Sequence, residues 1–366
     1  MTRLLMTADA VGGVWQYATE LATALVPFGV ETVIAVMGPS APSAAMSEPV
    51  PYRIVETGLP LDWLAPDAAS VIAAGHAVAD LARRIDADLV QLNSPSLAAV
   101  ARFDAPVVAV THGCVGTWWQ AARGTTPDAG FAWNVELMAA GLRAADAIVA
   151  PSAAFAATVR QAYALPAAPL VVHNGRTPLA LPDDVTAGDG VFTAGRLWDE
   201  VKNVALLDRV AGRIDVPFHA AGPASGPQGQ AVVADRLVLS GRLDEAGLAA
   251  MLAARPIYVS AARFEPFGLS VLEAATAGCP LVLSNIDTFR ELWTGAALLV
   301  PVDDDDAYVA AIGRIRGDAA LRTHLSEAAR LRAARYTPAA MAGAMAGIYA
   351  GLTDDADEAG ERRVAA

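Results

Sequence analysis

The sequence predicts an α/β protein with two domains, each built on a parallel β-sheet. Short apolar runs rich in valine, leucine and isoleucine recur along the 366 residues, and each is followed by a longer alanine- and leucine-rich helical pattern. Parallel strands joined by crossover helices produce this alternation, and strands covered on both faces appear as continuous apolar runs. The chain is also too long for one ordinary domain, so two sheets are expected.

The expected strands are the short apolar runs themselves, and helices occupy the intervals. Strands are expected in the first half at 3–6, 32–37, 89–92, 107–110, 147–149 and 170–173, and in the second half at 191–194, 218–221, 237–239, 257–260, 281–284 and 297–300. The helical patterns include 245–254, 269–277, 307–335 and 338–352.

The domain boundary is expected where this alternation stops. The stretch 176–190, RTPLALPDDVTAGDG, is polar and carries proline and glycine, a composition typical of a linker. We therefore expect a first domain over 1–182 and a second over 189–335. The sequence leaves open whether the final helix, about 338–352, packs back on the first domain.

Composition restricts the class of protein. The chain is 54% hydrophobic and 18% charged, which supplies large cores and excludes extended disorder. Its 39 acidic and 26 basic residues give a net charge of −13, with no run of five basic residues, so no nucleic acid is expected as a partner. The most apolar windows are broken well before the ~20 residues of a membrane span. Peripheral membrane contact stays open.

The first residues and the cysteines bear on location. The run 3–7 is strand-like and lacks the basic region, long apolar stretch and cleavage site of a secretory leader. Cys114 and Cys279 lie far apart without metal-ligand spacing, so we expect reduced thiols. The sequence therefore predicts a cytoplasmic protein.

The first candidate motif is 9–15, Asp-Ala-Val-Gly-Gly-Val-Trp, between the first strand and a helix whose apolar residues share one face. Gly12 and Gly13 allow a ligand to approach the backbone, and amides at a helix start favour an anion such as a diphosphate. The spacing is not the G-x-G-x-x-G of dinucleotide sites. A tight turn without a ligand explains the two glycines equally well.

The second motif is 195–203, Gly-Arg-Leu-Trp-Asp-Glu-Val-Lys-Asn, directly after the first strand of the second half. Ligands of parallel sheets bind at the carboxyl ends of strands, so this loop is expected to face the ligand. Arg196 can fork onto two pyrophosphate oxygens, and Lys202 can act as a point charge. Two solvated surface cations are the alternative, but Lys202 is the only lysine of the chain, which favours a ligand.

The third motif begins at Glu265-Pro-Phe-Gly and continues to Glu273 inside the following helix. A glycine at a loop-helix junction leaves free amides and the positive end of the helix dipole facing the ligand. Glu273 has apolar neighbours in sequence, which disfavours a solvent-facing glutamate. A carboxylate in that position can accept hydrogen bonds from two vicinal hydroxyls, as in a ribose.

Taken together, these motifs resemble those of the family-four retaining glycosyltransferases with the GT-B fold, the glycosyl transferases group 1. Glu273 follows Glu265 by eight residues, and the arginine and lysine lie upstream. The resemblance implies two Rossmann-like domains whose parallel sheets face a deep cleft. Further matches, over nearly the whole chain, are Asn174-Gly175, Ser152, Gly12-Gly13 and Thr111-His112-Gly113.

For the second domain, the resemblance implies the donor site. Arg196 and Lys202 would bind the donor diphosphate and stabilise the charge of the leaving group. Glu273 would hold the ribose hydroxyls, and Glu265 would contact the transferred sugar. The residues whose amides would bind sugar hydroxyls or phosphate are Phe267, Gly268 and Leu269.

For the first domain, the resemblance implies that Gly12 and Gly13 let the donor diphosphate and the acceptor approach the backbone. His112 would hydrogen-bond the donor sugar or lie beside the reacting face; a structural histidine is the alternative. Trp118 and Trp119 could line an acceptor site, because aromatic faces stack on sugar rings, or could pack beneath a loop.

These implications predict a retaining hexosyltransferase of carbohydrate biosynthesis. It would move a hexose from a UDP- or GDP-linked sugar to a sugar or small-molecule acceptor, on one face, with the leaving phosphate helping to deprotonate the acceptor. No metal and no other cofactor is expected, because the nucleotide sugar is a substrate. The acidic run 303–306 is read as a solvated helix start.

Three other classes of protein remain as alternatives. A nucleotide-sugar-binding protein without turnover would keep the same fold and ligand. A sugar-nucleotide epimerase or phosphorylase of similar two-domain build would share the nucleotide site, but the pair Glu265 and Glu273 with Lys202 favours transfer. A dehydrogenase is disfavoured because the dinucleotide motif is absent.

Overall fold

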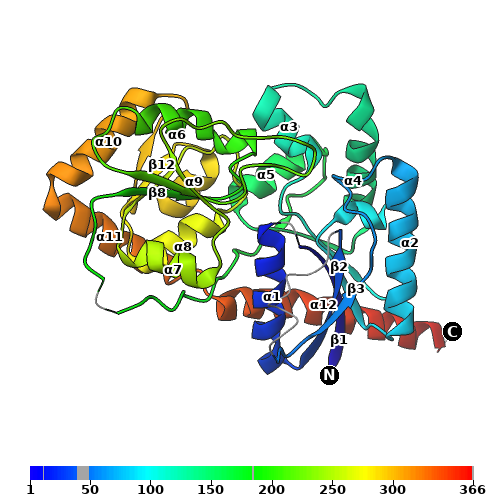
Figure 1. Cartoon of the computed structure of the whole chain (residues 1–366). Coiled ribbons are helices and arrows are strands. Elements are labelled where there is room, and N and C mark those ends of the chain that lie inside the picture. The colour runs from blue at the N-terminus through cyan, green and yellow to red at the C-terminus, as the bar shows by residue number, and fades with distance from the viewer. Residues whose placement is uncertain (11, 39–48, 184, 365–366) are drawn as a thin grey trace. The chain divides into compact units, whose positions relative to one another are not determined.

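The computed structural model describes residues 1–10, 12–38, 49–183 and 185–364. The chain forms two compact units, Met1–Gly175 together with Pro338–Ala366, and Arg176–Thr337. In each unit, helices cover both faces of one parallel sheet (Figure 1). The division falls at Arg176, the first residue of the linker expected from sequence, and the Arg176 amide donates to the Tyr336 carbonyl at 3.3 Å within the second unit.

The sheet of the first unit has seven parallel strands in the order β3-β2-β1-β4-β5-β6-β7. Leu5 in β1 lies opposite Val33 in β2 on one side and Val90 in β4 on the other. All three side chains are buried, as a sheet covered on both faces requires. The strands are β1 Thr2–Asp9, β2 Val30–Met37, β3 Arg53–Glu56, β4 Leu89–Leu92, β5 Val107–Val110, β6 Ala147–Ala150 and β7 Leu170–Val171.

Helices from both ends of the chain cover one face of this sheet. Leu21 of α1 (Gly13–Leu25) shares a buried cluster with Leu4 of β1 and Met345 of α12 (Pro338–Val364). Figure 1 shows α12 crossing α1, and the two helices are in contact. Val78 of α2 (Ala68–Arg84) belongs to a second cluster with Leu5 and Val90. The remaining helices of the unit are α3 Val115–Arg123, α4 Ala132–Ala144 and α5 Ala153–Ala162.

The sheet of the second unit has six parallel strands in the order β10-β9-β8-β11-β12-β13. Tyr258 in β11 pairs with Phe192 in β8 and with Leu281 in β12, and all three are buried. The strands are β8 Val191–Ala194, β9 Phe218–Ala221, β10 Val238–Gly241, β11 Ile257–Ser260, β12 Leu281–Ser284 and β13 Ala297–Val300.

Two buried clusters cover the faces of this second sheet. Val271 and Leu272 of α8 pack in one with Phe289 of α9, while Leu207 of α6 and Ile312 of α10 pack in the other. The helices are α6 Val204–Ala211, α7 Glu245–Ala253, α8 Leu269–Ala277, α9 Asp287–Trp293, α10 Asp305–Gly317 and α11 Ala319–Ala333.

The structure differs from the expected elements in several places, including those that follow. The expected helix 307–335 is two helices, because Asp318 ends α10 and caps α11 by accepting from the Leu321 amide at 2.9 Å. The last helix extends to Val364 rather than 352, and β7 ends at Val171 rather than 173. The strand β3 was not expected, since its four residues, RIVE, carry charges at both ends.

Candidate active site

Both sheets reverse their strand order beside their first strand. β1 lies between β2 and β4, and β8 lies between β9 and β11. Open α/β sheets bind ligands at the carboxyl ends of strands at such points. In the first unit Gly12 and Asn93 follow β1 and β4, and in the second Gly195 and Glu265 follow β8 and β11. The motifs therefore lie at the edge of each sheet where ligands bind.

The loop after β8 is shaped by close backbone packing and by one buried carboxylate. Gly195 has φ 154°, and a Cβ on Gly222 would lie 1.8 Å from the Gly195 carbonyl oxygen, so no larger residue fits there. The Asp199 side chain, only 2% exposed, accepts from the Arg196 guanidinium at 2.9 Å. Asp199, which sequence reasoning gave no role, therefore orients Arg196.

Lys202 and Glu265 form an ion pair across the two strand ends. The Lys202 Nζ donates to Glu265 Oε2 at 2.6 Å, and the side chains are 22% and 16% exposed. A cavity of about 20 Å³ adjoins the pair and is also lined by Gly195 and Ser270, which leaves room for about one water. Partial burial strengthens the field of such charges. The structure thus brings together two of the predicted donor residues.

The helix α8 starts directly after Gly268, at the loop-helix junction that the sequence indicated. Gly268 is the residue before the helix, at φ 95° and ψ 68°, a left-handed conformation that glycine adopts without strain. The amides of the first turn, beginning with Leu269, are left without intrahelical acceptors. Phe267 is 2% exposed, and its ring centroid lies 5.5 Å from that of Tyr336, so its side chain belongs to the core and only its backbone can reach a ligand.

Glu273 has a cationic partner that sequence reasoning missed. Arg176 Nε donates to Glu273 Oε1 at 2.9 Å, with the two side chains 14% and 10% exposed, and Arg176 Nη2 lies 3.3 Å from the exposed Glu245. Burial above all, and the negative charges of Glu273 and Glu265 to a lesser extent, raise the pKa of Tyr258. Both carboxylates therefore lie near enough to the buried Tyr258 hydroxyl to affect its pKa. The signal for Arg176 was its place directly after Asn174-Gly175.

In the first unit, His112 follows β5 and contacts Asn93, just after β4, and Tyr17 of α1. Its Nε2 lies 3.1 Å from Asn93 Oδ1, and its ring meets the Tyr17 ring edge-on with centroids 4.4 Å apart. Burial lowers the pKa of His112 to about 3, because desolvation disfavours the charged imidazolium. His112 is thus a neutral hydrogen-bonding group at physiological pH.

Gly12 and Gly13 lie where β1 passes into α1. Gly12 is the residue before the helix, in an extended conformation at φ −146°, and its carbonyl accepts from the Trp15 amide at 3.2 Å. Asp9, at the end of β1, accepts from the Trp63 indole at 3.2 Å. The dihedral angles of Gly12 do not require glycine, so the predicted close approach of a ligand remains the reason proposed for it.

Trp118 and Trp119 belong to an aromatic cluster on α3. Their ring centroids are 6.2 Å apart, and the Trp119 and Phe131 centroids are 5.3 Å apart. The Arg123 guanidinium lies 5.9 Å from both indole rings, within cation-π distance. Both indoles are partly exposed, so they pack on one another and still offer surface to a ligand.

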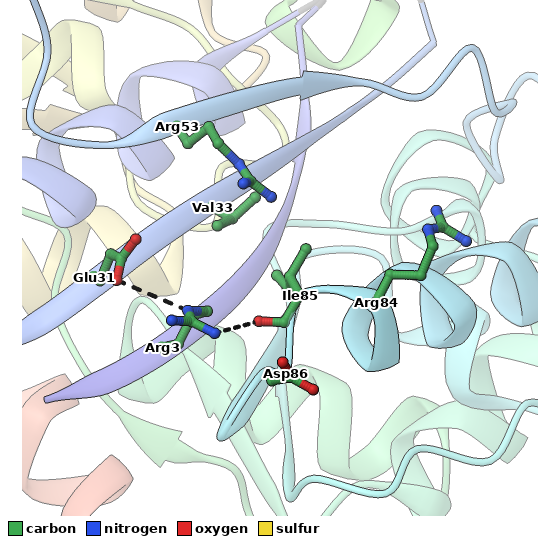
Figure 2. A pocket seen from close by; sticks show the side chains of 7 residues that line it. All are labelled: Arg3, Glu31, Val33, Arg53, Arg84, Ile85 and Asp86. Carbon is green, nitrogen blue, oxygen red and sulfur yellow. Dashed lines mark hydrogen bonds and ion pairs between the residues drawn. The ribbon is translucent and has the colours of Figure 1, made fainter.

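A second hollow, of about 320 Å³, lies at the opposite end of the first unit's strands (Figure 2). Figure 2 shows Arg3 at its centre, donating to the Ile85 carbonyl at 2.6 Å and lying 3.8 Å from Glu31. Arg53, Arg84 and Asp86 complete a rim of mixed charge. Because this is the amino-terminal edge of the sheet, it is separate from the candidate site.

Within the described ranges, no group of three or more His, Cys, Asp or Glu side chains could hold a metal ion. The acidic run 303–306 has other roles: Asp304 caps α10, and Asp303 pairs with Arg263. Among the helices that the structure describes, none is both long enough and apolar enough to cross a membrane.

Family models match the chain in two consecutive segments. The model described as Glycosyltransferase Family 4 matches residues 11–177. The model described as Glycosyl transferases group 1 matches residues 188–318. The first match includes His112 and the second includes Lys202, Glu265 and Glu273, so both candidate sites lie inside matched segments.

Two characterised relatives are transferases by name. Phosphatidyl-myo-inositol mannosyltransferase from Mycolicibacterium smegmatis is 25% identical over 355 residues, which are 90% of this chain and 87% of that protein. Alpha-D-kanosaminyltransferase from Streptomyces kanamyceticus is 26% identical over 200 residues, which are 53% of this chain and 48% of that protein.

Solved structures share the fold. Sucrose-phosphate synthase from Thermosynechococcus elongatus superposes with a TM-score of 0.78 at 19% identity, over 97% of this chain and 100% of that chain. HepE from Anabaena, in complex with UDP-glucose, superposes with a TM-score of 0.72 at 18% identity, over 96% and 100%. With its two parallel sheets and both segments matched, the chain belongs to the family-4, group 1 glycosyltransferases and is an enzyme of the GT-B fold.

Proposed function

We propose that this glycosyltransferase is a retaining, metal-independent enzyme that transfers a hexose from a UDP- or GDP-linked sugar to a hydroxyl of a small acceptor. The observation that carries the proposal is the pair of ion pairs in the second unit. Lys202 with Glu265 and Arg176 with Glu273 put two cations and two carboxylates at the carboxyl edge of one sheet. A diphosphate needs the cations, and sugar hydroxyls need the carboxylates as acceptors.

The donor would be held by charge and by backbone together. Arg196 and Lys202 bind the diphosphate, and their attraction grows as the leaving group gains negative charge. The amides of Phe267, Gly268 and Leu269 add donors at the positive end of α8. Because Lys202 is tied to Glu265 at 2.6 Å, its ammonium has a defined place before the donor arrives, which limits the reorganisation that the reaction requires.

The sugar and ribose hydroxyls would be bound by the carboxylates. Glu273 accepts from the ribose hydroxyls while Arg176 holds its Oε1. Glu265 accepts from the transferred hexose. His112 and the backbone at Gly12 and Gly13 form the complementary site of the first unit, where neutral His112 hydrogen-bonds the donor sugar.

The names of similar proteins support this donor class. HepE was solved with UDP-glucose, and the relative from Mycolicibacterium smegmatis is named a mannosyltransferase. We propose a soluble, small acceptor bound near Trp118 and Trp119, because the chain carries a net charge of −13, which repels anionic lipid surfaces. A cytoplasmic location is part of the proposal, and the free thiols Cys114 and Cys279 support it.

A ligand screen followed by product analysis tests the proposal. Thermal unfolding is measured with UDP, GDP, ADP and their glucose and mannose conjugates, since a ligand that binds the folded state raises the apparent stability. The matching donor is then incubated with a panel of acceptors in the presence of EDTA. We expect one nucleotide series to stabilise the protein and the product to keep the anomeric configuration of the donor.

Each component of the proposal can fail separately. Product of inverted configuration would refute retention, and loss of turnover in EDTA would refute metal independence. Binding without transfer to any acceptor in the panel would favour a nucleotide-sugar-binding protein. Interconversion of the donor itself would favour an epimerase.

A further inference from the structure

A buried hydrogen-bond network lies beneath His112 in the first unit. Gln91 lies in β4 and Asn93 directly follows that strand, and their side chains contact one another. Gln91 Nε2 donates to Asn93 Oδ1 at 3.1 Å and to the Tyr17 hydroxyl at 3.3 Å. Asn93 Oδ1 also lies 3.1 Å from His112 Nε2. Gln91 is fully buried, so each of its polar atoms needs a partner.

The orientation of the Asn93 amide follows from Thr7 in β1. Asn93 Nδ2 donates to the Thr7 carbonyl at 2.6 Å, and the Asn93 backbone amide donates to the Thr7 hydroxyl at 3.0 Å. Exchanging Nδ2 and Oδ1 would put two acceptors in contact, so only one orientation is compatible with the carbonyl. Oδ1 must therefore face His112 as an acceptor.

The same argument extends to Gln91 and then to the last helix. Oδ1 of Asn93 accepts, so the atom of Gln91 that faces it must be Nε2, and Oε1 must point the other way. There Gln91 Oε1 accepts from the hydroxyl of Tyr349 in α12. Tyr349 is 2% exposed, and burial raises the pKa of its hydroxyl well above the usual value. It therefore remains a neutral donor.

These directions determine the state of His112. An acceptor faces Nε2, so Nε2 must carry the proton, and the neutral ring keeps Nδ1 unprotonated as an acceptor. Both lone pairs of Asn93 Oδ1 are then used, one by His112 and one by Gln91. A ring with the opposite tautomer would put a lone pair against Oδ1.

We propose that Asn93 is a positioning residue that fixes His112 as the Nε2–H tautomer, and that Gln91 and Tyr349 hold the Asn93 side chain in place. The last helix thereby becomes part of the site of the first unit. The consequence for transfer rests on the proposed function, because His112 would offer Nδ1 as the acceptor for a substrate hydroxyl. The tautomer itself does not depend on that function.

Nitrogen NMR of the free protein tests the tautomer. The chain has five histidines, and the His112→Gln variant identifies the resonances of His112 in protein labelled with ¹⁵N-histidine. We expect a protonated Nε2 and an unprotonated Nδ1 in wild type. Asn93→Ala should show a mixture of tautomers. Asn93→Asp should shift His112 toward the doubly protonated ring near neutral pH, since a carboxylate would then face Nε2.

Transfer kinetics test the positioning role. Asn93→Ala should lower kcat on the order of 10-fold, because a misdirected ring no longer presents its acceptor. Tyr349→Phe leaves the buried Gln91 Oε1 without its donor, so it should lower kcat roughly fivefold and also lower the melting temperature of the folded variant. Tyr52→Phe is the matched control, a partly buried tyrosine packed against the same core, and should leave kcat and the His112 resonances unchanged.

The outcomes separate this proposal from the proposed function. A protonated Nδ1 in wild type, or an unchanged tautomer in Asn93→Ala, would overturn the positioning role of Asn93. If Tyr349→Phe matched Tyr52→Phe both in the His112 resonances and in kcat, α12 would have no part in positioning His112. An Nε2–H tautomer that depends on Asn93, in a protein that transfers no sugar, would support the network and refute only the proposed activity.

Discussion

The two units organise their candidate sites by opposite means. In the second unit, the site consists of charges: Lys202 is paired with Glu265 at 2.6 Å, and Arg176 with Glu273 at 2.9 Å. In the first unit, the site around His112 consists of neutral groups, with Asn93 fixed by Thr7. Both sites lie beside a strand-order reversal of a parallel sheet, so the same fold supports both.

The difference shows what each ligand would require. A diphosphate carries full charges, and cations at a partly buried edge, together with amides at a helix start, can balance them. Hydroxyls carry no charge, so a neutral imidazole of defined tautomer suffices. Charge substitutions should therefore have the largest effects in the second unit, and substitutions that change hydrogen-bond direction should act in the first.

The largest effect is expected for Lys202→Ala. Removing the ammonium removes an attraction that grows in the transition state, and kcat/KM should fall by on the order of 10²-fold. Arg209→Ala is the control, since its pair with Asp305 is an exposed ion pair of the same unit and should alter turnover less than about twofold. Steady-state kinetics of both variants measure these changes in kcat/KM. Near-normal turnover in Lys202→Ala would refute the assignment of the donor site.

The next effect is expected for Glu273→Gln. The amide keeps the shape of the side chain but cannot accept from a ribose hydroxyl and from Arg176 as a carboxylate does, so nucleotide affinity should fall roughly tenfold. Glu245→Gln is a matched control, because Glu245 contacts the same arginine but is 70% exposed against 10% for Glu273. Titration calorimetry with the matching nucleotide measures the nucleotide affinity of both variants. Equal losses would mean that the buried contact has no special role.

A smaller effect is expected for Gly268→Ala. The left-handed conformation alone costs a non-glycine residue about 1 kcal/mol of folding free energy. At Gly268 the new Cβ would also lie 3.3 Å from Glu265 Cγ and from Phe289, whereas a Cβ on Gly29, at φ 72°, meets nothing within 4 Å. Thermal unfolding should therefore show a larger loss for Gly268→Ala than for Gly29→Ala.

A ligand measurement extends the same comparison. Nucleotide binding should weaken in Gly268→Ala, because Glu265 must move, and should stay at the wild-type value in Gly29→Ala. If both variants lost the same stability and both bound normally, the crowded start of α8 would have no part in the donor site.

The last prediction concerns His112 and pH. Its pKa is lowered from 6.5 to about 3, so the unfolded chain binds the extra proton first as pH falls. The contribution of neutral His112 to the free energy of unfolding is therefore complete above pH 6.5 and is lost as the pH falls toward 3. Between these values the slope of unfolding free energy against pH should be up to about 1.4 kcal/mol per pH unit shallower in His112→Gln than in wild type.

Chemical denaturation at a series of pH values between those limits measures this slope. His324→Gln, at an exposed position on α11, should leave it unchanged. Equal slopes in wild type and His112→Gln would mean that the ring is not held neutral in the folded state, and would remove the contrast between the charged and the neutral site.

The elements that could be predicted from sequence were those with a simple period. Strands such as 107–110 and 257–260 were expected with the bounds that the structure has, because buried parallel strands read as unbroken apolar runs. The strand β3 was missed because it is short and charged at both ends. The break at Asp318 was missed because the helical pattern continues through it, and a capping aspartate looks like any other acid in a helix.

The motifs of the candidate site were also visible in the sequence, but their partners were not. Lys202 and Glu265 were each predicted as donor residues, and the structure shows that they pair. Arg176 fell in the expected linker and was passed over, although it holds Glu273. Asn93 and Gln91 carry no motif, since an amide at the end of a strand gives no local signal of what it contacts.

The sequence by itself determined the α/β class, the two parallel sheets and the glycine, cation and carboxylate residues of the motifs, because periodicity and spacing are local properties of the chain. Only the tertiary structure decided which cation meets which carboxylate, that α12 packs with the first unit, and which nitrogen of His112 carries the proton. Those depend on contacts between residues far apart in sequence, such as Tyr349 and Gln91, and on the direction of each hydrogen bond between them.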